Sequence, residues 1–257
     1  MNRTLLAAAV LLTACKPPEA PDTIEEMMVY GFANFDEDPE YIVALADNLI
    51  PWMEENREAL GEGYEINDLT TEHLVAAGIE DREVDGVVGA AAGLYYTASM
   101  DELAFGLSYA EQAEIFEAYL EFDRLRETEQ GCFLDHSCPT HDSLAEVHAN
   151  LGAGIEMWNE FEQVLRWVDG GDWGRLMLVR ITGPTPVEFS VDWLEVPQQY
   201  SFSFVYPDAD GAATRVQAIW VEGRVIGADV PETFALTLGI NNMVNSAADL
   251  DAWLAAR

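Results

Sequence analysis

The chain has 257 residues, of which 49% are hydrophobic, 11% aromatic and 23% charged. This composition is typical of a globular protein and excludes a disordered, collagen-like or low-complexity chain. The 47 acidic and 12 basic residues give a net charge of −35, and so negative a field repels phosphate backbones, which excludes a nucleic-acid partner.

The amino terminus carries the pattern of a bacterial export signal. Arg3 supplies a positive charge, and residues 5–12 form an apolar run too short to span a bilayer as a helix. The run ends in Leu12-Thr13-Ala14-Cys15, which resembles the lipobox of bacterial lipoproteins. In that family the signal is cleaved before the cysteine, whose sulfur and new amino group then receive fatty acyl chains.

The resemblance implies that residues 1–14 are a signal peptide and that Cys15 carries acyl chains such as palmitate. Two or more chains anchor a protein stably where one binds only marginally. An ordinary secretory signal with a chance cysteine is the alternative. Lys16, in place of an aspartate, favours the outer membrane, so we expect a cell-envelope protein facing the periplasm or the exterior. The proline-rich residues 15–22 are expected to form a stiff tether.

The first part of the body is expected to be helical. Apolar residues over 23–60 recur at helical spacing, and Pro51 is expected to kink or restart the second helix. Thr71 is expected to cap a short helix. Residues 84–97 are rich in Val, Tyr and small side chains, which favours an extended segment.

Three segments match the capping box, in which a serine and a glutamate three residues later satisfy the N–H groups at a helix start. They begin at Ser99, Ser108 and Ser143. The last two are expected to open long helices over about 108–127 and 143–168, because apolar side chains in both segments recur every three or four residues.

From residue 176 onward, apolar and polar residues alternate. The alternating runs are 176–181, 187–193, 200–206 and 214–222. They are separated by turns rich in Pro, Gly and Asp, and they predict an antiparallel meander. Residues 231–240 fit a strand or a helix, and Ser246 is expected to cap a final helix. The predicted fold class is α+β: one domain over 23–257, with N-terminal helices and an antiparallel β-meander packed against long helices.

Cys132 and Cys138 are the two thiols that remain if Cys15 is lipidated. In an oxidising compartment, this pair predicts a local disulfide. The alternative is a zinc site of the same two cysteines with His136 and His141, since thiolate and imidazole ligands suit that ion.

One face of the predicted meander is aromatic. Its members are Phe189, Trp193, Tyr200, Phe202, Phe204 and Trp220. This face is expected either to line a pocket for an apolar ligand or to be covered by helices as ordinary core.

The sequence contains no nucleophile elbow, zinc-protease motif, phosphate-binding loop or dinucleotide fingerprint. We therefore expect a protein that is not an enzyme and needs no cofactor or metal.

The order of elements over 84–257 resembles the helix-grip order of START-like lipid-binding domains. The segments that suggest it are residues 214–220, Val230-Pro231, and Asn242-Met243 leading into the last helix. The resemblance implies a curved sheet that a long final helix closes over a hydrophobic cavity. The resulting hypothesis is a lipid-anchored, non-catalytic envelope protein that binds a hydrophobic small molecule or lipid. The alternative is a structural or interaction protein with a filled core, and the oligomeric state stays open.

The surplus of carboxylates generates a prediction about salt. Lys16 is the only lysine, a bias that resembles proteins of salt-adapted organisms. Because the Debye length falls to about 3 Å at 1 M salt, added NaCl screens the repulsion among the acidic side chains. We expect the melting temperature, followed by circular dichroism, to rise from low salt to 1 M NaCl. A constant melting temperature would contradict this prediction.

Overall fold

The computed structural model describes residues 18–84, 87–208, 210–227 and 232–257, without the side chains of residues 60, 232–235 and 238. The predicted lipidation site, Cys15, lies outside these residues. The helices are α1 (Ile24–Ala33), α2 (Pro39–Glu55), α3 (Thr71–Ala76), α4 (Met100–Ser108), α5 (Gln130–Leu134) and α6 (Glu232–Ala255). The strands are β1 (Tyr64–Ile66), β2 (Val88–Tyr95), β3 (Tyr119–Glu127), β4 (Thr140–Gly152), β5 (Ile155–Asp169), β6 (Arg175–Thr182), β7 (Glu188–Phe189), β8 (Leu194–Pro207) and β9 (Ala213–Val225). Short 3₁₀ turns are η1 (Leu60–Glu62), η2 (Gln112–Glu114) and η3 (Gly171–Trp173).

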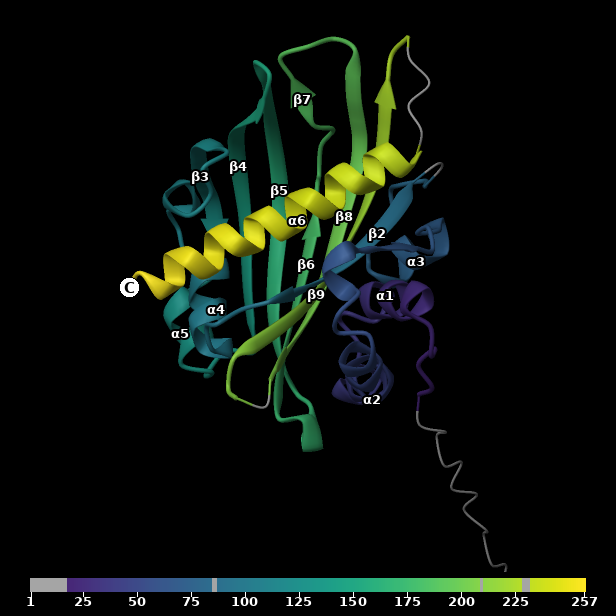
Figure 1. Ribbon diagram of the computed structural model, residues 1–257, viewed down its shortest axis with the longest axis vertical. Helices are drawn as coiled ribbons and strands as arrows, with labels where there is room; N and C mark the ends of the chain where they lie inside the picture. Colours follow the sequence, from purple (N-terminus) through teal and green to yellow (C-terminus); the bar gives the residue numbers. More distant parts are fainter. Residues whose placement is uncertain (1–17, 85–86, 209, 228–231) are drawn as a thin grey trace, which may run out of the picture.

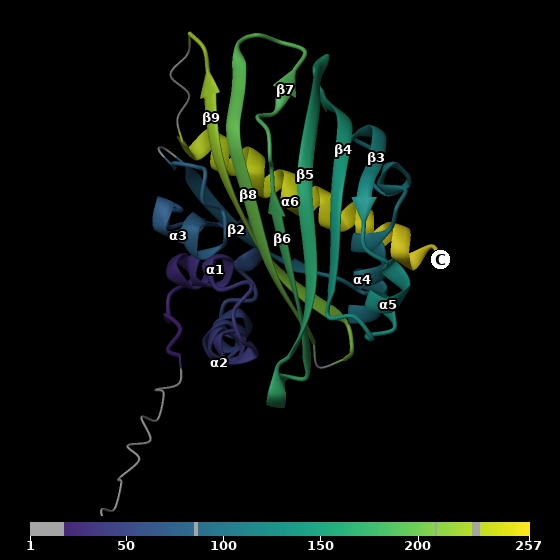
Figure 2. The ribbon, with the colours of Figure 1, turned by 180° about the vertical axis from the view of Figure 1, so that it is seen from behind.

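Within the described residues, nine strands form one antiparallel sheet. Their order is β1-β2-β9-β8-β6-β5-β4-β3, and β7 pairs with β5. Helix α6 runs diagonally across one face of this sheet (Figure 1). Helices α1 and α2 lie on the opposite face, against the part formed by β8 and β9 (Figure 2). The α+β fold class is thus confirmed, and the long last helix across an antiparallel sheet is the helix-grip arrangement expected from the sequence.

The predicted N-terminal helices are also confirmed, and three of the four runs of the meander form β6, β8 and β9. The fourth run, 187–193, is wrong: only Glu188–Phe189 is a strand, and it pairs with β5, so β6 pairs directly with β8. Helices α1 and α2 occupy the first segment, but α2 continues through Pro51 to Glu55 instead of restarting there. The short helix begins at Thr71 with Thr70 as its cap, one residue earlier than expected. Strand β2 occupies the predicted extended segment.

The two long middle helices predicted over 108–127 and 143–168 are wrong. These segments form β3, β4 and β5. In β4, the side chains of Ala145, Val147 and Ala149 are buried and alternate with more exposed ones. Apolar side chains at every second residue also fall at many positions three or four apart, so the same residues fitted a helical period. The turn 152–154, in which all three residues have positive φ angles, closes a hairpin where a helix was expected.

Of the three predicted capping boxes, one is confirmed and two are wrong. Ser99 does cap α4: its hydroxyl accepts the Glu102 N–H, and the Glu102 carboxylate accepts the Ser99 N–H at 2.8 Å. Ser108 instead ends α4, where its hydroxyl donates to the carbonyl of Ala104 at 2.7 Å. Ser143 lies in β4. A serine with a glutamate three residues later therefore marks a helix start only where the tertiary structure also places one.

The open segment 231–240 belongs to a helix from Glu232 onward. Ser246 lies inside α6, so it is not the cap that we expected. Met243, Ala247 and Leu250 are the buried residues of α6. None of the helices in the described part of the chain has the length and apolarity that crossing a membrane requires.

The sheet separates two hydrophobic cores. The first lies under α1 and α2, where Phe32 packs edge-on against Tyr200 and Trp220 with ring centroids 5.9 and 5.5 Å apart. The second lies under α4, α5 and α6 and includes Leu165 and Val205. Because neighbouring residues of a strand point to opposite faces, the central strands supply both cores.

The described end of the predicted tether lies against α2. The side-chain amide of Asn48 donates to the carbonyls of Ala20 and Pro21, both at 2.9 Å. These contacts join the last residues of segment 15–22 to the domain.

The close packing of α1 on the sheet at Gly31 generates a stability prediction. A methyl group at Gly31 would lie 2.3 Å from the Phe202 ring, whereas one at Gly61 would meet nothing within 4 Å. We expect Gly31→Ala to lower the free energy of unfolding by about 1–3 kcal/mol through overpacking, and Gly61→Ala to change it by less than about 0.5 kcal/mol. Urea unfolding of both variants measures the difference, and equal effects would contradict this packing.

Candidate functional site

The structure does not bring the six predicted aromatic side chains together. Tyr200, Phe202, Phe204 and Trp220 are 0–2% exposed in the core under α1 and α2. Phe189 is half-buried in the short strand β7, and Trp193 is 42% exposed in the segment that leads into β8. Four of the six therefore act as core, and the other two lie apart from them.

A different group of aromatic side chains lies on the face of the sheet that α6 crosses. These are Phe116, Tyr119, Phe122 and Phe161, here called the aromatic row. Successive ring centroids are 5.1, 6.0 and 6.1 Å apart. All four are half-buried, so they contact the protein on one side and are open on the other. Burial raises the pKa of Tyr119 to about 12, which keeps its hydroxyl neutral.

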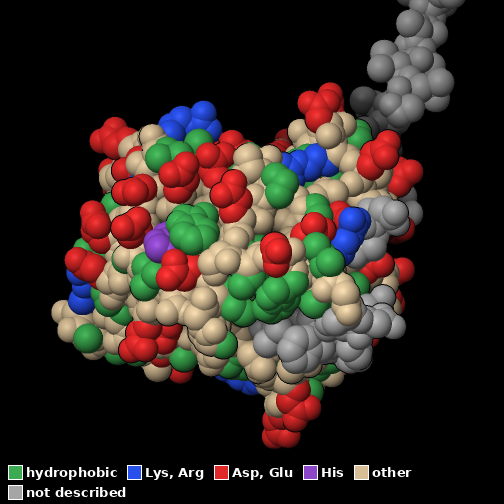
Figure 3. Space-filling model, turned by 90° about the horizontal axis from the view of Figure 1, so that it is seen from above, with side chains coloured by type: hydrophobic (Ala, Val, Ile, Leu, Met, Phe, Trp, Pro, Cys, Tyr) green, Lys and Arg blue, Asp and Glu red, His purple; other side chains and the backbone are tan. Residues whose placement is uncertain are grey.

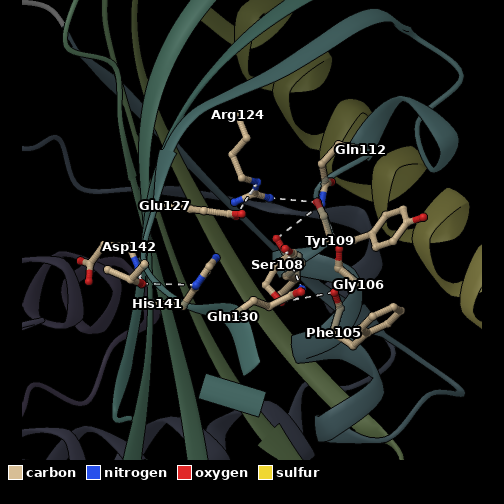
Figure 4. A network of polar contacts seen from close by, with 12 residues as sticks. Phe105, Gly106, Ser108, Tyr109, Gln112, Arg124, Glu127, Gln130, His141 and Asp142 are labelled. Atoms are coloured by element: carbon tan, nitrogen blue, oxygen red, sulfur yellow. Dashed lines mark hydrogen bonds and ion pairs between the residues drawn. The ribbon is translucent and has the colours of Figure 1, made fainter. Parts of the chain in front are cut away.

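Next to the row lie three buried polar side chains, Arg124, His141 and Ser143, here called the polar trio. Figure 4 shows Arg124 and His141. The Arg124 side chain is 6% exposed, His141 is 0% and Ser143 is 4% exposed. The guanidinium carbon of Arg124 is 5.6 Å from the centroid of the Phe122 ring. Arg124 lies on β3, where it pairs with Ala145 of β4. His141 and Ser143 lie on β4, at alternate positions that are both buried.

The trio contains hydrogen-bonding atoms without partners. Within the described residues, Nη1 of Arg124, Nε2 of His141 and Oγ of Ser143 are buried and make no hydrogen bond. Nη2 of Arg124 donates to the Tyr109 carbonyl at 2.9 Å, and Nε lies 3.4 Å from a Glu127 carboxylate oxygen without hydrogen-bond geometry. Buried polar groups normally find partners. Four atoms of these three side chains, Nε of Arg124 included, have none in the described part of the chain, which makes the trio a candidate binding site.

Two polar side chains next to the trio are paired. The amide of Gln112 donates to the carbonyls of Gly106 and Tyr109, both at 2.9 Å. The amide of Gln130 donates to the Ser108 carbonyl at 2.9 Å. These bonds satisfy the carbonyls at the end of α4, so the surroundings of the trio are well paired.

The trio presents donors. Thr128 accepts the Asp142 N–H at 2.9 Å, which leaves its hydroxyl hydrogen for Nδ1 of His141, 3.4 Å away. His141 then carries its own proton on Nε2. Burial, and next the charge of Arg124, lower the pKa of His141, which favours this neutral form. The arrangement offers N–H and O–H groups to a ligand and no acceptor except the Ser143 oxygen.

Cys132 and Cys138 form a disulfide that closes the turn after α5. The alternative zinc ligands are directed elsewhere. His136 lies 3.2 Å from the Asp101 carboxylate, and His141 belongs to the trio. Among the described residues, no group of three or more His, Cys, Asp or Glu side chains could hold a metal ion.

Two open pockets lie away from the trio. One, of about 300 Å³, is lined by several carboxylates with His148 and Trp158, whose rings stack 4.6 Å apart. Figure 3 looks onto an end of the molecule where acidic side chains crowd around a histidine and a hydrophobic side chain. The second, of about 560 Å³, lies between α2 and Asp169. Acidic side chains are so abundant in this chain that neither pocket is distinctive.

Sequence reasoning missed Arg124 and gave His141 no role beyond the zinc alternative. Ser143 was expected to cap a helix. The available signal was the spacing of Phe122 and Arg124 at alternate positions, which puts them on one face only when 119–127 is taken as a strand.

No family model and no curated protein matches the chain. Among solved structures, a START superfamily protein from Mycobacterium smegmatis is similar, with 9% identity, 65% of this chain and 97% of that chain covered, and a TM-score of 0.43. The human StarD13 lipid transfer and protein localization domain has 10% identity, 79% and 94% coverage, and a TM-score of 0.43. The Zhui aromatase/cyclase from Streptomyces sp. R1128 has 15% identity, 66% and 93% coverage, and a TM-score of 0.39. At such low identities and TM-scores these likenesses assign no function.

Proposed function

We propose that this chain is a lipid-anchored, non-catalytic protein of the bacterial cell envelope that binds a small hydrophobic ligand on the α6 side of its sheet. The observation that carries the proposal is the aromatic row. Its four side chains are neighbours in space and half-buried. The rest of this face of the sheet is covered by the hydrophobic core under α4, α5 and α6. Such a surface suits the apolar body of a ligand, because aromatic rings add specific contacts to the area they bury.

The polar trio supports binding rather than catalysis. Acyl-transfer chemistry by a serine needs a base within hydrogen-bond reach. Ser143 Oγ and His141 Nε2 are both without a hydrogen-bond partner, so they do not form such a pair. The donors of the trio are suited to hold a ligand in place.

The second candidate function is an envelope structural or interaction protein without a ligand. The filled core under α1 and α2 favours it, because the aromatic face that looked most like a pocket is completely packed. The two candidates differ in what the aromatic row does, and a binding measurement separates them.

Lipid anchoring rests on the resemblance of Leu12-Thr13-Ala14-Cys15 to a lipobox. We expect the protein expressed in bacteria to partition into the detergent phase of Triton X-114, because acyl chains give stable membrane affinity. Cys15→Ser should move it to the aqueous phase, and the neighbouring Lys16→Ser should not. Equal partitioning of the three proteins would contradict the anchor.

Ligand binding is tested with 2-naphthalenemethanol, a neutral fused aromatic probe, by isothermal titration calorimetry on the purified protein. We expect saturable binding that Phe122→Ala weakens about tenfold, since loss of one aromatic contact and its buried area is worth about 1–3 kcal/mol. Trp193→Ala removes an exposed aromatic side chain outside the row and should leave the affinity unchanged. Absence of saturable binding would favour the ligand-free alternative.

A further inference from the structure

We infer that the ligand is a hydrophobic carboxylic acid, whose carboxylate is bound by Arg124, His141 and Ser143 in exchange for the internal carboxylate of Glu127. This inference rests on the proposed function and adds the chemical class of the ligand. Its body would lie on the aromatic row and its head on the polar trio.

The first argument is charge. Arg124 is one of only 12 basic residues in a chain with 47 acidic ones, and its side chain is 6% exposed. Desolvation lowers the pKa of Arg124, which means that burial opposes its positive charge. The charge still persists at neutral pH, because a guanidinium does not lose its proton in proteins. A buried cation is stabilised when an anion contacts it with good hydrogen-bond geometry.

The second argument is the kind of group that the orphaned atoms require. Nη1 of Arg124, Nε2 of His141 and the Ser143 hydroxyl can all donate. A carboxylate offers two oxygens with about four acceptor positions and no donor. Its oxygens can therefore accept from donors of this kind, whereas an amine has no acceptor to offer while protonated and a single hydroxyl has fewer acceptor positions.

The third argument is that Glu127 already performs part of this role. Its carboxylate lies 3.4 Å from Nε of Arg124, but its side chain is 41% exposed and it is the last residue of β3. Figure 4 shows it extending toward the guanidinium from the edge of the cluster. Glu127 can therefore turn outward into water, and the space beside Arg124 then becomes available to another carboxylate.

The fourth argument joins the head to the body. The Arg124 guanidinium carbon lies 5.6 Å from the Phe122 ring centroid, and Phe122 continues the row toward Phe161. A carboxylate on the trio thus places an attached apolar group directly against the row. No ligand that lacks either part would use both features.

The experiment compares 2-naphthoate with the neutral 2-naphthalenemethanol, both titrated calorimetrically at one ionic strength. For the unaltered protein, we expect 2-naphthoate to bind at least about tenfold more tightly, as hydrogen bonds to charged groups imply. Arg124→Gln should remove this preference and change the affinity for the neutral probe less than about twofold. Arg126→Gln, on the same strand with a 72% exposed side chain, is the matched control and should keep the preference.

A second pair of variants tests the exchange. Here we expect the affinity for 2-naphthoate to rise, whereas Arg124→Gln is expected to lower it. Glu127→Gln removes the competing internal carboxylate. This variant should therefore bind 2-naphthoate at least about threefold more tightly than the unaltered protein does. Glu121→Gln removes the same charge from a 74% exposed side chain of β3 and should change the affinity less than about twofold. This pair keeps the inference testable if Arg124→Gln does not fold.

The outcomes separate the two proposals. Absence of binding by both probes would overturn the ligand-binding function and this inference together. Binding of both probes with equal affinity would overturn only the carboxylate assignment. A lower affinity of Glu127→Gln for 2-naphthoate would also overturn it, because Glu127 would then support the site instead of occupying it.

Discussion

The structure depends on one constraint: the central strands of a single antiparallel sheet must supply two separate hydrophobic cores. In β8, Phe202 and Phe204 face α1 and α2, while Val205 belongs to the core under α6. In β6, Leu178 and Val179 are divided in the same way. Strands covered on both faces lose the regular alternation of polar and apolar residues. The helices that pack on each face determine which of its side chains are buried.

The two faces differ in how completely they are filled. The face under α1 and α2 is packed so closely that Gly31 has no space for a methyl group against Phe202. The other face is filled under α4 and α6 but carries half-buried aromatic side chains toward β3. The proposed ligand site therefore lies on the less completely covered face, since a ligand needs apolar surface that the protein itself does not bury.

The arginines on the two faces of the sheet also differ in how they are paired. Arg166 donates to the carbonyl of Glu37 at 2.8 Å and also to that of Phe35. Arg180 pairs with the Asp36 carboxylate at 2.8 Å and lies over the Phe35 ring. These two side chains join the loop between α1 and α2 to the sheet. In contrast, Nη1 of Arg124 makes no hydrogen bond within the described residues. Its guanidinium lies over Phe122 of the aromatic row.

The sequence by itself determined the helical start, the C-terminal meander, the α+β class and the proximity of Cys132 to Cys138, because these depend on local periodicity and on short loops. It also carries the lipobox resemblance at Cys15, a short motif that involves no tertiary contact. Only the tertiary structure decided that 119–127 and 140–169 are strands. Their side chains fit both periods, and the extended form is selected because β3 pairs with β4, β4 with β5 and β5 with β6. It also decided which aromatic face is core and which is open, because that depends on where α1, α2 and α6 pack. Arg124, His141 and Ser143 become neighbours only once β3 pairs with β4, so the sequence did not show that they form one group.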